Sequence, residues 1–369
     1  MRISRRDFSR LGAMGLAARA LPSSSFAEAP GDGKVGYCVI GLGVIADHFM
    51  RAVQQSSNSK ITGLVSGHRD KAERIAAQYG VPKSSIYSYE DMDKMRENKT
   101  IDAVYVALPN SMHAEYTIRS AKAGKHVLCE KPMSTTVSEA EAMIAACKLM
   151  QVKLMIGYRL HYDPLNLKAI KLIRDGAIGT VETINGAFGF NAKPNQWRLN
   201  KALAGGGSLF DVGIYVLNAS RYLTGEEPVK FTGVVSTIDH DGRFDTMEEN
   251  VSWTLKFPSG VLATGSSTYG AQMSGYFKVF GSKGNLEMGP VYDYSGVRLR
   301  ANYEGNSPDA PRVVIDETSQ DQDPAQFTRE AEHFSECVLK NQTPTSPGEE
   351  GLRDMQYIQA IYRAAGVNM

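Results

Sequence analysis

Short apolar runs alternate with amphipathic stretches through the first half of this 369-residue chain. The apolar runs have the length of buried strands, and the stretches between them repeat apolar residues at helical spacing. The predicted strands cover 35–40, 61–65, 101–108, 126–129 and 153–156, and the predicted helices cover 47–55, 69–79, 113–123 and 138–150. This alternation predicts a parallel sheet with helices on both faces.

The pattern changes after Gly179, where longer strands follow one another with turns between them. Strands are predicted over 183–190, 230–238, 250–257, 261–268 and 277–280, and two helices over 324–339 and 351–365. Strands in direct succession predict an open, largely antiparallel sheet with helices on one face only. The uncovered face in turn predicts a homodimer. The fold class is therefore an α/β domain followed by an α+β domain.

A glycine-rich turn connects the first strand to the first helix. It reads Gly41-Leu42-Gly43-Val44-Ile45-Ala46. In this setting the first glycine allows the tight turn and the second lets the backbone approach a diphosphate. The start of the helix then offers N–H groups to the phosphates. We therefore expect a Rossmann dinucleotide-binding domain over 34–157. The rest, 158–369, is expected to bind substrate and form oligomers, with its last helices packing back on the first domain.

The end of the second strand indicates which dinucleotide binds. NAD-binding domains usually place an acidic residue there for the ribose hydroxyls. Here the chain has Ser66 at this point, followed by Arg69 and Lys71. A hydroxyl and two cations suit a 2′-phosphate, which an acidic residue would repel. The sequence therefore favours NADP.

Charge and the N-terminus limit the possible partners and the location. The chain has 41 Lys and Arg against 40 Asp and Glu, so no basic surplus suggests nucleic acid. Residues 1–27 have the layout of a cleaved export signal, with the twin arginines Arg5-Arg6 before a short Gly- and Ala-rich run. We expect the twin-arginine export machinery as a partner and a periplasmic mature protein outside the membrane. The four cysteines are scattered, so neither a disulfide nor a metal site is predicted.

Chemistry-bearing residues follow the strands at the carboxyl edge of the predicted parallel sheet. Leu108 ends one strand, and Lys131 follows another, just before Pro132. Ligands bind at this edge in open α/β sheets, so Lys131 is expected to reach a nicotinamide crevice. In the second half, Asp211 and Tyr215 stand four residues apart in a helical pattern, which predicts that they share one helix face.

Several long stretches resemble one known family. They are "GLGVIA", "LVSGHRDKA", "LPNSMHAE", "CEKPM", "LMIGYRLHYDPLN", "QWRLNKALAGGGSLFDVGIYVLN" and "YLTGEEP", in this order. Together they resemble the glucose–fructose oxidoreductase group of the Gfo/Idh/MocA superfamily, which includes aldose–aldose oxidoreductases. The glucose–fructose enzyme has a proline-rich arm after its signal, whereas here few residues separate the predicted cleavage site from Lys34. A dimer is therefore expected rather than that enzyme's tetramer.

The resemblance assigns roles to individual residues. It implies that Lys131 is the catalytic lysine, and that Asp211 and Tyr215 form the acid–base pair. Most of the superfamily has histidine at the position of Tyr215. Ser66 and Lys71 match contacts to the 2′-phosphate. Further positions that would line the cofactor or the sugar are Tyr89, Leu108, Asn110, His113, Glu130, Arg159, Trp197, Arg198 and Tyr294. The substrate is expected to contact Lys131, Arg159, Tyr162, Asp211 and Tyr215.

The implied reaction oxidises an aldose at C1 to the aldonolactone while Tyr215 removes the hydroxyl proton. A second sugar, aldose or ketose, then takes the hydride and leaves as an alditol, so tightly bound NADP is never exchanged. Such a cycle is compatible with export to a compartment without an NADP pool. Three alternatives stay open: an aldose 1-dehydrogenase with exchangeable NADP, an exported NAD-dependent glycosidase of the same superfamily, and a non-catalytic sugar-binding protein.

Overall fold

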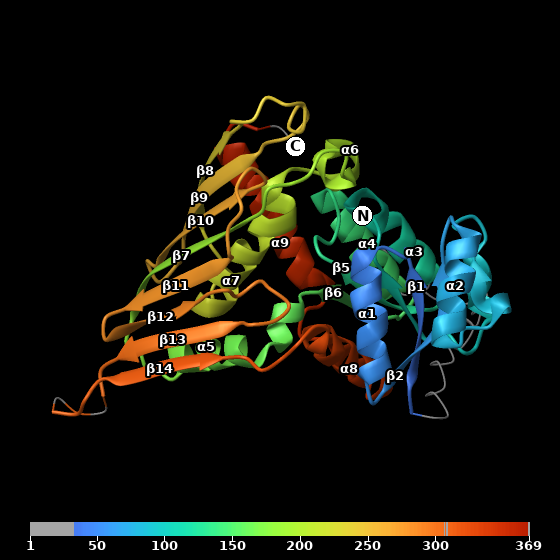
Figure 1. Ribbon diagram of the computed structural model, residues 1–369, viewed down its shortest axis with the longest axis horizontal. Helices are drawn as coiled ribbons and strands as arrows, with labels where there is room; N and C mark the ends of the chain where they lie inside the picture. Colours follow the sequence, from blue (N-terminus) through green and yellow to red (C-terminus); the bar gives the residue numbers. More distant parts are fainter. Residues whose placement is uncertain (1–32, 306, 308, 368–369) are drawn as a thin grey trace, which may run out of the picture.

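The two predicted domains form two sheets with helices between them (Figure 1). The computed structural model describes residues 33–305, 307 and 309–367. The predicted export signal over 1–27 therefore lies outside the described residues. In Figure 1 the larger sheet stands at one side, and helices α7 (Ile214–Thr224) and α9 (Gly348–Ala364) lie between it and the first domain.

The first domain is a six-stranded sheet in which every neighbouring pair of strands is parallel, in the order β3-β2-β1-β4-β5-β6. This is the strand order of a dinucleotide-binding Rossmann fold, so the predicted fold class is confirmed. Its strands are β1 (Val35–Ile40), β2 (Ser59–Val65), β3 (Ile86–Tyr87), β4 (Ala103–Val106), β5 (His126–Glu130) and β6 (Leu154–Gly157). Its helices are α1 (Val44–Gln55), α2 (Arg69–Tyr79), α3 (His113–Lys122) and α4 (Val137–Leu149).

The second domain has an eight-stranded sheet in the order β14-β13-β12-β11-β7-β10-β9-β8. Only the β7–β10 pair is parallel among these strands, so the sheet is largely antiparallel, as predicted. The strands are β7 (Val181–Gly189), β8 (Lys230–Ser236), β9 (Asn250–Lys256), β10 (Leu262–Thr268), β11 (Tyr276–Gly281), β12 (Gly284–Met288), β13 (Arg298–Tyr303) and β14 (Val313–Thr318). Its remaining helices are α5 (Pro164–Arg174), α6 (Lys201–Ala204) and α8 (Ala325–Leu339).

The sequence pattern missed the two-residue strand β3 in the first domain and β12, β13 and β14 in the second, and it made the strand over 101–108 too long. The three missed strands of the second domain have one exposed face with charged pairs such as Arg298–Asp316, which weakens their apolar signal. The strand predicted over 101–108 is only β4. It pairs in parallel with Tyr37–Ile40 of β1, which limits its length although Ile101 is also buried.

The core of the second domain packs one face of its sheet against α7. Along β9, Val251, Trp253 and Leu255 point inward and the residues between them face outward. One described segment, Lys201–Thr224, could cross a membrane by length and composition, but 78% of its most apolar window is buried inside the protein. That burial is typical of a core helix. The four cysteines are likewise buried, as free thiols.

The last two helices connect the domains. Helix α8 lies against α1 and also contacts β1. The Tyr37 hydroxyl of β1 and the Ser335 Oγ of α8 are 2.9 Å apart. Helix α9 packs on α4, and its buried Asp354 accepts a hydrogen bond from Arg221 of α7 at 2.6 Å. Tyr158, just after β6, donates to the other Asp354 oxygen at 2.7 Å. This buried polar contact fixes α7 relative to the end of the first sheet.

Glu330 of α8 generates a prediction about stability. Its side chain is fully buried, and neither carboxyl oxygen has a hydrogen-bond partner among the residues that the structure describes. Burial raises the pKa of Glu330 well above its usual value, Glu130 raises it further, and Arg159 opposes the shift. The pKa of this group is ~4.3 in the unfolded chain. Its contribution to stability is therefore full below that value and is lost as the pH rises through the folded-state pKa.

Glu330→Gln is expected to become more stable relative to the unaltered protein as the pH rises from weakly acidic to weakly alkaline, by roughly 1–3 kcal/mol. Urea unfolding at the two pH values measures the difference. Glu336→Gln, which removes an exposed carboxylate from the same helix, is the control and should give no such gain. A difference for Glu330→Gln that does not change with pH would contradict the prediction.

Candidate active site between the domains

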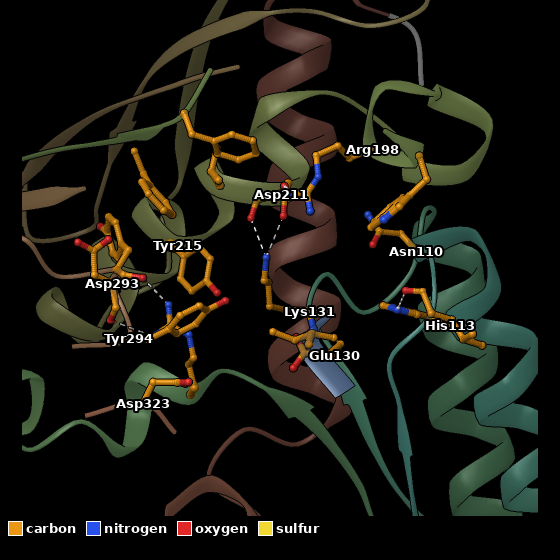
Figure 2. A pocket seen from close by; sticks show the side chains of 18 of the residues that line it. Asn110, His113, Glu130, Lys131, Arg198, Asp211, Tyr215, Asp293, Tyr294 and Asp323 are labelled. Carbon is orange, nitrogen blue, oxygen red and sulfur yellow. Dashed lines mark hydrogen bonds and ion pairs between the residues drawn. The ribbon is translucent and has the colours of Figure 1, made fainter. Parts of the chain in front are cut away.

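A cavity of about 640 Å³ lies between the two domains (Figure 2). The first domain lines it with residues from the start of α1 and from the ends of β4 and β5. The second domain contributes the chain around α6 and α7 and the connection between β12 and β13. Of the predicted residues, the following line it: Ile45, Leu108, Asn110, His113, Glu130, Lys131, Arg159, Trp197, Arg198, Asp211, Tyr215 and Tyr294.

The start of α1 fits the diphosphate of a dinucleotide. Gly41 has a φ of +86°, and a Cβ there would lie 2.5 Å from the carbonyl oxygen of Ala107. At Gly43 no heavy atom of the described residues would lie within 4 Å of a Cβ, so among them the main chain is open to a ligand. Gly43 is the N-cap of α1 and offers no side-chain cap, and the next residue, Val44, is 79% exposed. The first N–H groups of an α-helix have no acceptor within the helix, so those of α1 are available to bind phosphates.

The residues predicted for the 2′-phosphate lie at the end of β2. The Ser66 Oγ accepts a hydrogen bond from the His68 N–H at 3.0 Å, and Lys71 is exposed. Arg69, which was also predicted to bind the 2′-phosphate, has partners within the protein. Its guanidinium donates to Glu73 and to the carbonyl oxygen of Ile86, both at 2.9 Å, so it is already engaged in the fold. Tyr89 packs edge-on against Tyr116, with the ring centroids 5.3 Å apart, outside the cavity lining.

Lys131 connects the two domains inside the cavity. It follows β5, and its Nζ donates to the Asp211 main-chain oxygen at 2.8 Å and to Asp211 Oδ1 at 3.2 Å. The same Nζ lies 4.6 Å from the centroid of the Tyr215 ring. Burial alone would lower the pKa of Lys131, but Tyr215, Asp211 and Glu130 together raise it. Figure 2 shows Lys131 pointing up to Asp211 with Tyr215 beside it.

Asp211 is the most highly connected carboxylate of the site. Its Oδ2 accepts hydrogen bonds from Arg198 and from the Tyr269 hydroxyl, the latter at 2.9 Å. Burial would raise the pKa of Asp211, but the charges of Lys131 and Arg198 lower it to about 2. Asp211 is therefore ionised at neutral pH. The sequence pattern does not point to Tyr269, which directly follows β10, because only folding brings this strand end to Asp211.

The helix that carries Asp211 and Tyr215 is wound differently from the prediction. Leu209–Gly213 forms a π-helical turn, after which α7 begins at Ile214. Both side chains nevertheless line the cavity. Asp211 and Tyr215 therefore share one face, as predicted, although the helix is wound more widely between them. Glu248, also missed from the sequence, accepts from the Gly207 and Leu209 N–H groups at 3.1 and 3.4 Å. It thereby fixes the start of this turn.

Arg159 forms a second positive centre in the cavity. It is 4% exposed, and it donates to the Tyr292 carbonyl oxygen at 2.5 Å and to Gln326. Its Cζ lies 4.5 Å from the centroid of the Tyr294 ring and 5.4 Å from that of Tyr215. The phenol rings of Tyr215 and Tyr294 thus both lie against the buried guanidinium of Arg159.

Residues at the edge of the first sheet fix its turns. Each His113 ring nitrogen lies 2.8 Å from a main-chain oxygen, that of Pro132 or of Leu108. The Asn110 side chain donates to the carbonyl oxygen of Ala204 at 2.8 Å, which joins this edge to α6. Burial raises the pKa of Glu130, whose carboxylate accepts from Tyr105 at 2.5 Å.

Tyr162 lies away from the position predicted for it. Its hydroxyl is 3.5 Å from the Met155 sulfur, and its ring packs 5.0 Å from that of His333 on α8. Tyr162 does not belong to the cavity lining. The prediction that it contacts substrate is corrected here, because the side chain fills the space between β6 and α8.

The fold and the cavity define a dinucleotide-dependent oxidoreductase with its site between two domains. A profile described as "Oxidoreductase family, NAD-binding Rossmann fold" matches residues 35–158, and one described as "GFO/IDH/MocA C-terminal domain" matches 166–287. The chain belongs to the GFO/IDH/MocA oxidoreductase family, which confirms the resemblance drawn from its motifs.

Individual relatives agree with this assignment. The structure of aldose–aldose oxidoreductase from Caulobacter crescentus, complexed with glycerol, is 45% identical with a TM-score of 0.84, covering 90% of this chain and 98% of that one. The D-xylose 1-dehydrogenase [NADP(+)] of Haloarcula marismortui is 33% identical, covering 90% of this chain and 92% of that protein. D-xylose 1-dehydrogenase (NADP(+)) 2 of Haloferax volcanii is 28% identical, covering 84% and 91%.

The contact between Lys131 and Asp211 leads to a prediction. Asp211→Asn is expected to lower the pKa of Lys131, because one of the groups that raise it is lost. The pH dependence of Lys131 acetylation, followed by mass spectrometry of the labelled peptide, measures the shift. Asp316→Asn removes a carboxylate paired with an arginine on the outer sheet face and serves as the control. Unchanged labelling of Lys131 in Asp211→Asn would show that Asp211 does not set its charge.

Proposed function

We propose that this protein is a sugar oxidoreductase that keeps its NADP bound through a complete cycle. It oxidises an aldose at C1 to the aldonolactone and reduces a second sugar, aldose or ketose, to the alditol. The observation that carries the proposal is the cluster of Lys131, Asp211 and Tyr215 in the cavity onto which the N-terminus of α1 opens. The 45% identical relative is named an aldose–aldose oxidoreductase, which supports the same reaction here.

Each side chain of the cluster has a distinct task in the proposed reaction. When bound, the nicotinamide supplies a hydride acceptor for the hydrogen on C1. Tyr215 takes the proton of the C1 hydroxyl, so that the C1–O bond becomes the lactone carbonyl. Lys131 places its positive charge beside the Tyr215 ring and favours the proton-accepting form. Asp211, ionised with a pKa of about 2, holds Lys131 in place and does not act as the base.

The second half of the cycle reverses these transfers on another sugar. An open-chain carbonyl takes the hydride at carbon, and Tyr215 returns the proton to its oxygen, which gives the alditol. The two half-reactions balance, because one sugar loses what the other gains. The second sugar accepts the hydride and Tyr215 keeps the proton between the two half-reactions, so no external oxidant is required.

The choice of NADP rests on the end of β2. Ser66 directly follows β2 and the exposed Lys71 lies in the first turn of α2, and no acidic side chain stands at the position that usually binds the ribose hydroxyls. Two relatives are named for NADP(+), which supports the choice. Arg69 is left out of this part of the proposal, since it is bonded to Glu73.

Export and dimerisation complete the proposal. The twin-arginine pattern of residues 1–27 supports export to the periplasm, where retained NADP removes the need for a cofactor pool. The uncovered face of the second sheet supports a homodimer. Val234, Leu262 and Phe280, on three of its strands, are 69%, 45% and 39% exposed. Apolar side chains in this position favour contact with a second copy.

The decisive experiment supplies one aldose to the purified mature protein without adding cofactor. We expect aldonolactone or aldonic acid and alditol in equal amounts, with NADP released on acid treatment. If alditol forms only after fructose is added, the enzyme is of the glucose–fructose type. If turnover requires free NADP, the protein is an aldose 1-dehydrogenase, as the names of the xylose-oxidising relatives also suggest, and the retained-cofactor cycle is wrong.

Tyr215→Phe is expected to abolish turnover, by about 10³-fold or more, because the proton acceptor is lost. The phenyl ring keeps the contacts with Phe188 and Tyr292, so bound nucleotide should remain. Product analysis and the nucleotide content of the purified variant measure both effects. Tyr276→Phe changes a tyrosine on the outer sheet face and should retain activity. Full activity of Tyr215→Phe would refute the role of Tyr215.

A further inference from the structure

A polar contact between the domains closes one side of the cavity near the start of α1. Asp323, just before α8, places Oδ1 2.6 Å from His48 Nδ1 and accepts a hydrogen bond from Arg51 at 2.7 Å through Oδ2. His48 and Arg51 lie on α1, more than 270 residues earlier in the chain. Asp323 itself lines the cavity. The contact therefore ties the helix that begins at the glycine turn to the chain that enters α8.

Tyr294 packs beside this contact and lines the same side of the cavity. Its ring centroid lies 4.6 Å from that of His48, and 5.7 Å from that of Phe327 on α8. On its other side, the ring meets the Arg159 guanidinium at 4.5 Å. Tyr294 belongs to the connection between β12 and β13, so it is a residue of the second domain. Figure 2 shows Tyr294 and Asp323 on the side of the cavity away from Asn110 and His113.

The contact is better built than an ordinary surface ion pair. Both Asp323 oxygens are engaged, and the His48 and Asp323 side chains are only 14% and 27% exposed. Burial would raise the pKa of Asp323, but hydrogen bonds from Arg51 and His48 lower it, so the carboxylate is ionised at neutral pH. His48 also stacks on Phe327, with centroids 5.6 Å apart. Ionic and ring contacts thus support the same closure.

We propose that His48, Arg51 and Asp323 form a clasp that retains the bound cofactor. The uncapped start of α1 and the Lys131 cluster open onto one cavity, and the clasp holds Tyr294 and Asp323 as part of its wall. A bound dinucleotide leaves only after this wall moves away from α1. The inference rests on the proposed retained-cofactor cycle, because it names residues of this chain that make retention possible.

The test measures how fast bound NADPH leaves the protein. Purified protein is loaded with NADPH, freed of excess nucleotide and mixed with a large excess of NADP⁺, and the fluorescence of bound NADPH is followed. The double variant His48→Gln/Arg51→Gln is expected to release NADPH about tenfold faster. Asp323→Asn, which removes the carboxylate that faces His48 and Arg51, should accelerate the release of NADPH to a similar extent. Arg119→Gln removes an arginine–aspartate pair elsewhere on the first domain and should release NADPH at the unaltered rate.

The rate of binding distinguishes a clasp from the loss of a simple contact. A wall that opens more easily admits NADPH faster as well as releasing it faster, so association with nucleotide-free protein should also accelerate in the clasp variants. Release no faster than in Arg119→Gln, or faster release with unchanged association, would overturn the proposal. If the unaltered protein itself loses NADPH within seconds, the retained-cofactor cycle fails. The ratio of rates between variants still decides whether the clasp exists.

Discussion

The ion pair between Lys131 and Asp211 is the contact on which the site depends. Lys131 comes from the edge of the parallel sheet and Asp211 from the helix beneath the antiparallel sheet. Neither charge could be buried alone without a large desolvation cost, so each domain needs the other to complete its half of the site. Arg198 and Tyr269 occupy the second Asp211 oxygen and leave Lys131 a fixed position beside Tyr215.

The surrounding structure holds this pair at a defined distance. Glu248 fixes the start of the π-helical turn, and Asp354 binds Arg221 of α7 in the core. Glu248 accepts from buried main-chain N–H groups, and Asp354 shares the Arg221 guanidinium with Glu227 and Glu350, so these buried donors are satisfied. The two helices after the second sheet return to the first domain, so the cavity walls belong to one continuous packing arrangement.

The two sides of the second sheet serve different purposes. Its inner face carries the core that supports α7, whereas its outer face is rich in Ser, Thr and exposed apolar side chains such as Val234. The outer face, through which we propose that the protein dimerises, lies away from the cavity. The residues of the proposed clasp, in contrast, lie at the junction between the domains and reach the cavity through Asp323.

The sequence by itself determined the domain order, most of the strands and helices, and the glycine turn, because these depend on local periodicity and on backbone conformations that few residues allow. It also identified Lys131, Asp211 and Tyr215, although it treated the last two as neighbours on a regular helix. The tertiary structure alone decided what surrounds them. Tyr269, Glu248 and Asp323 lie far along the chain from their partners, and Tyr162 and Arg69 turned out to be engaged in packing and hydrogen bonds. Local patterns cannot predict such contacts, because the partners of a buried charge are chosen by how the elements pack.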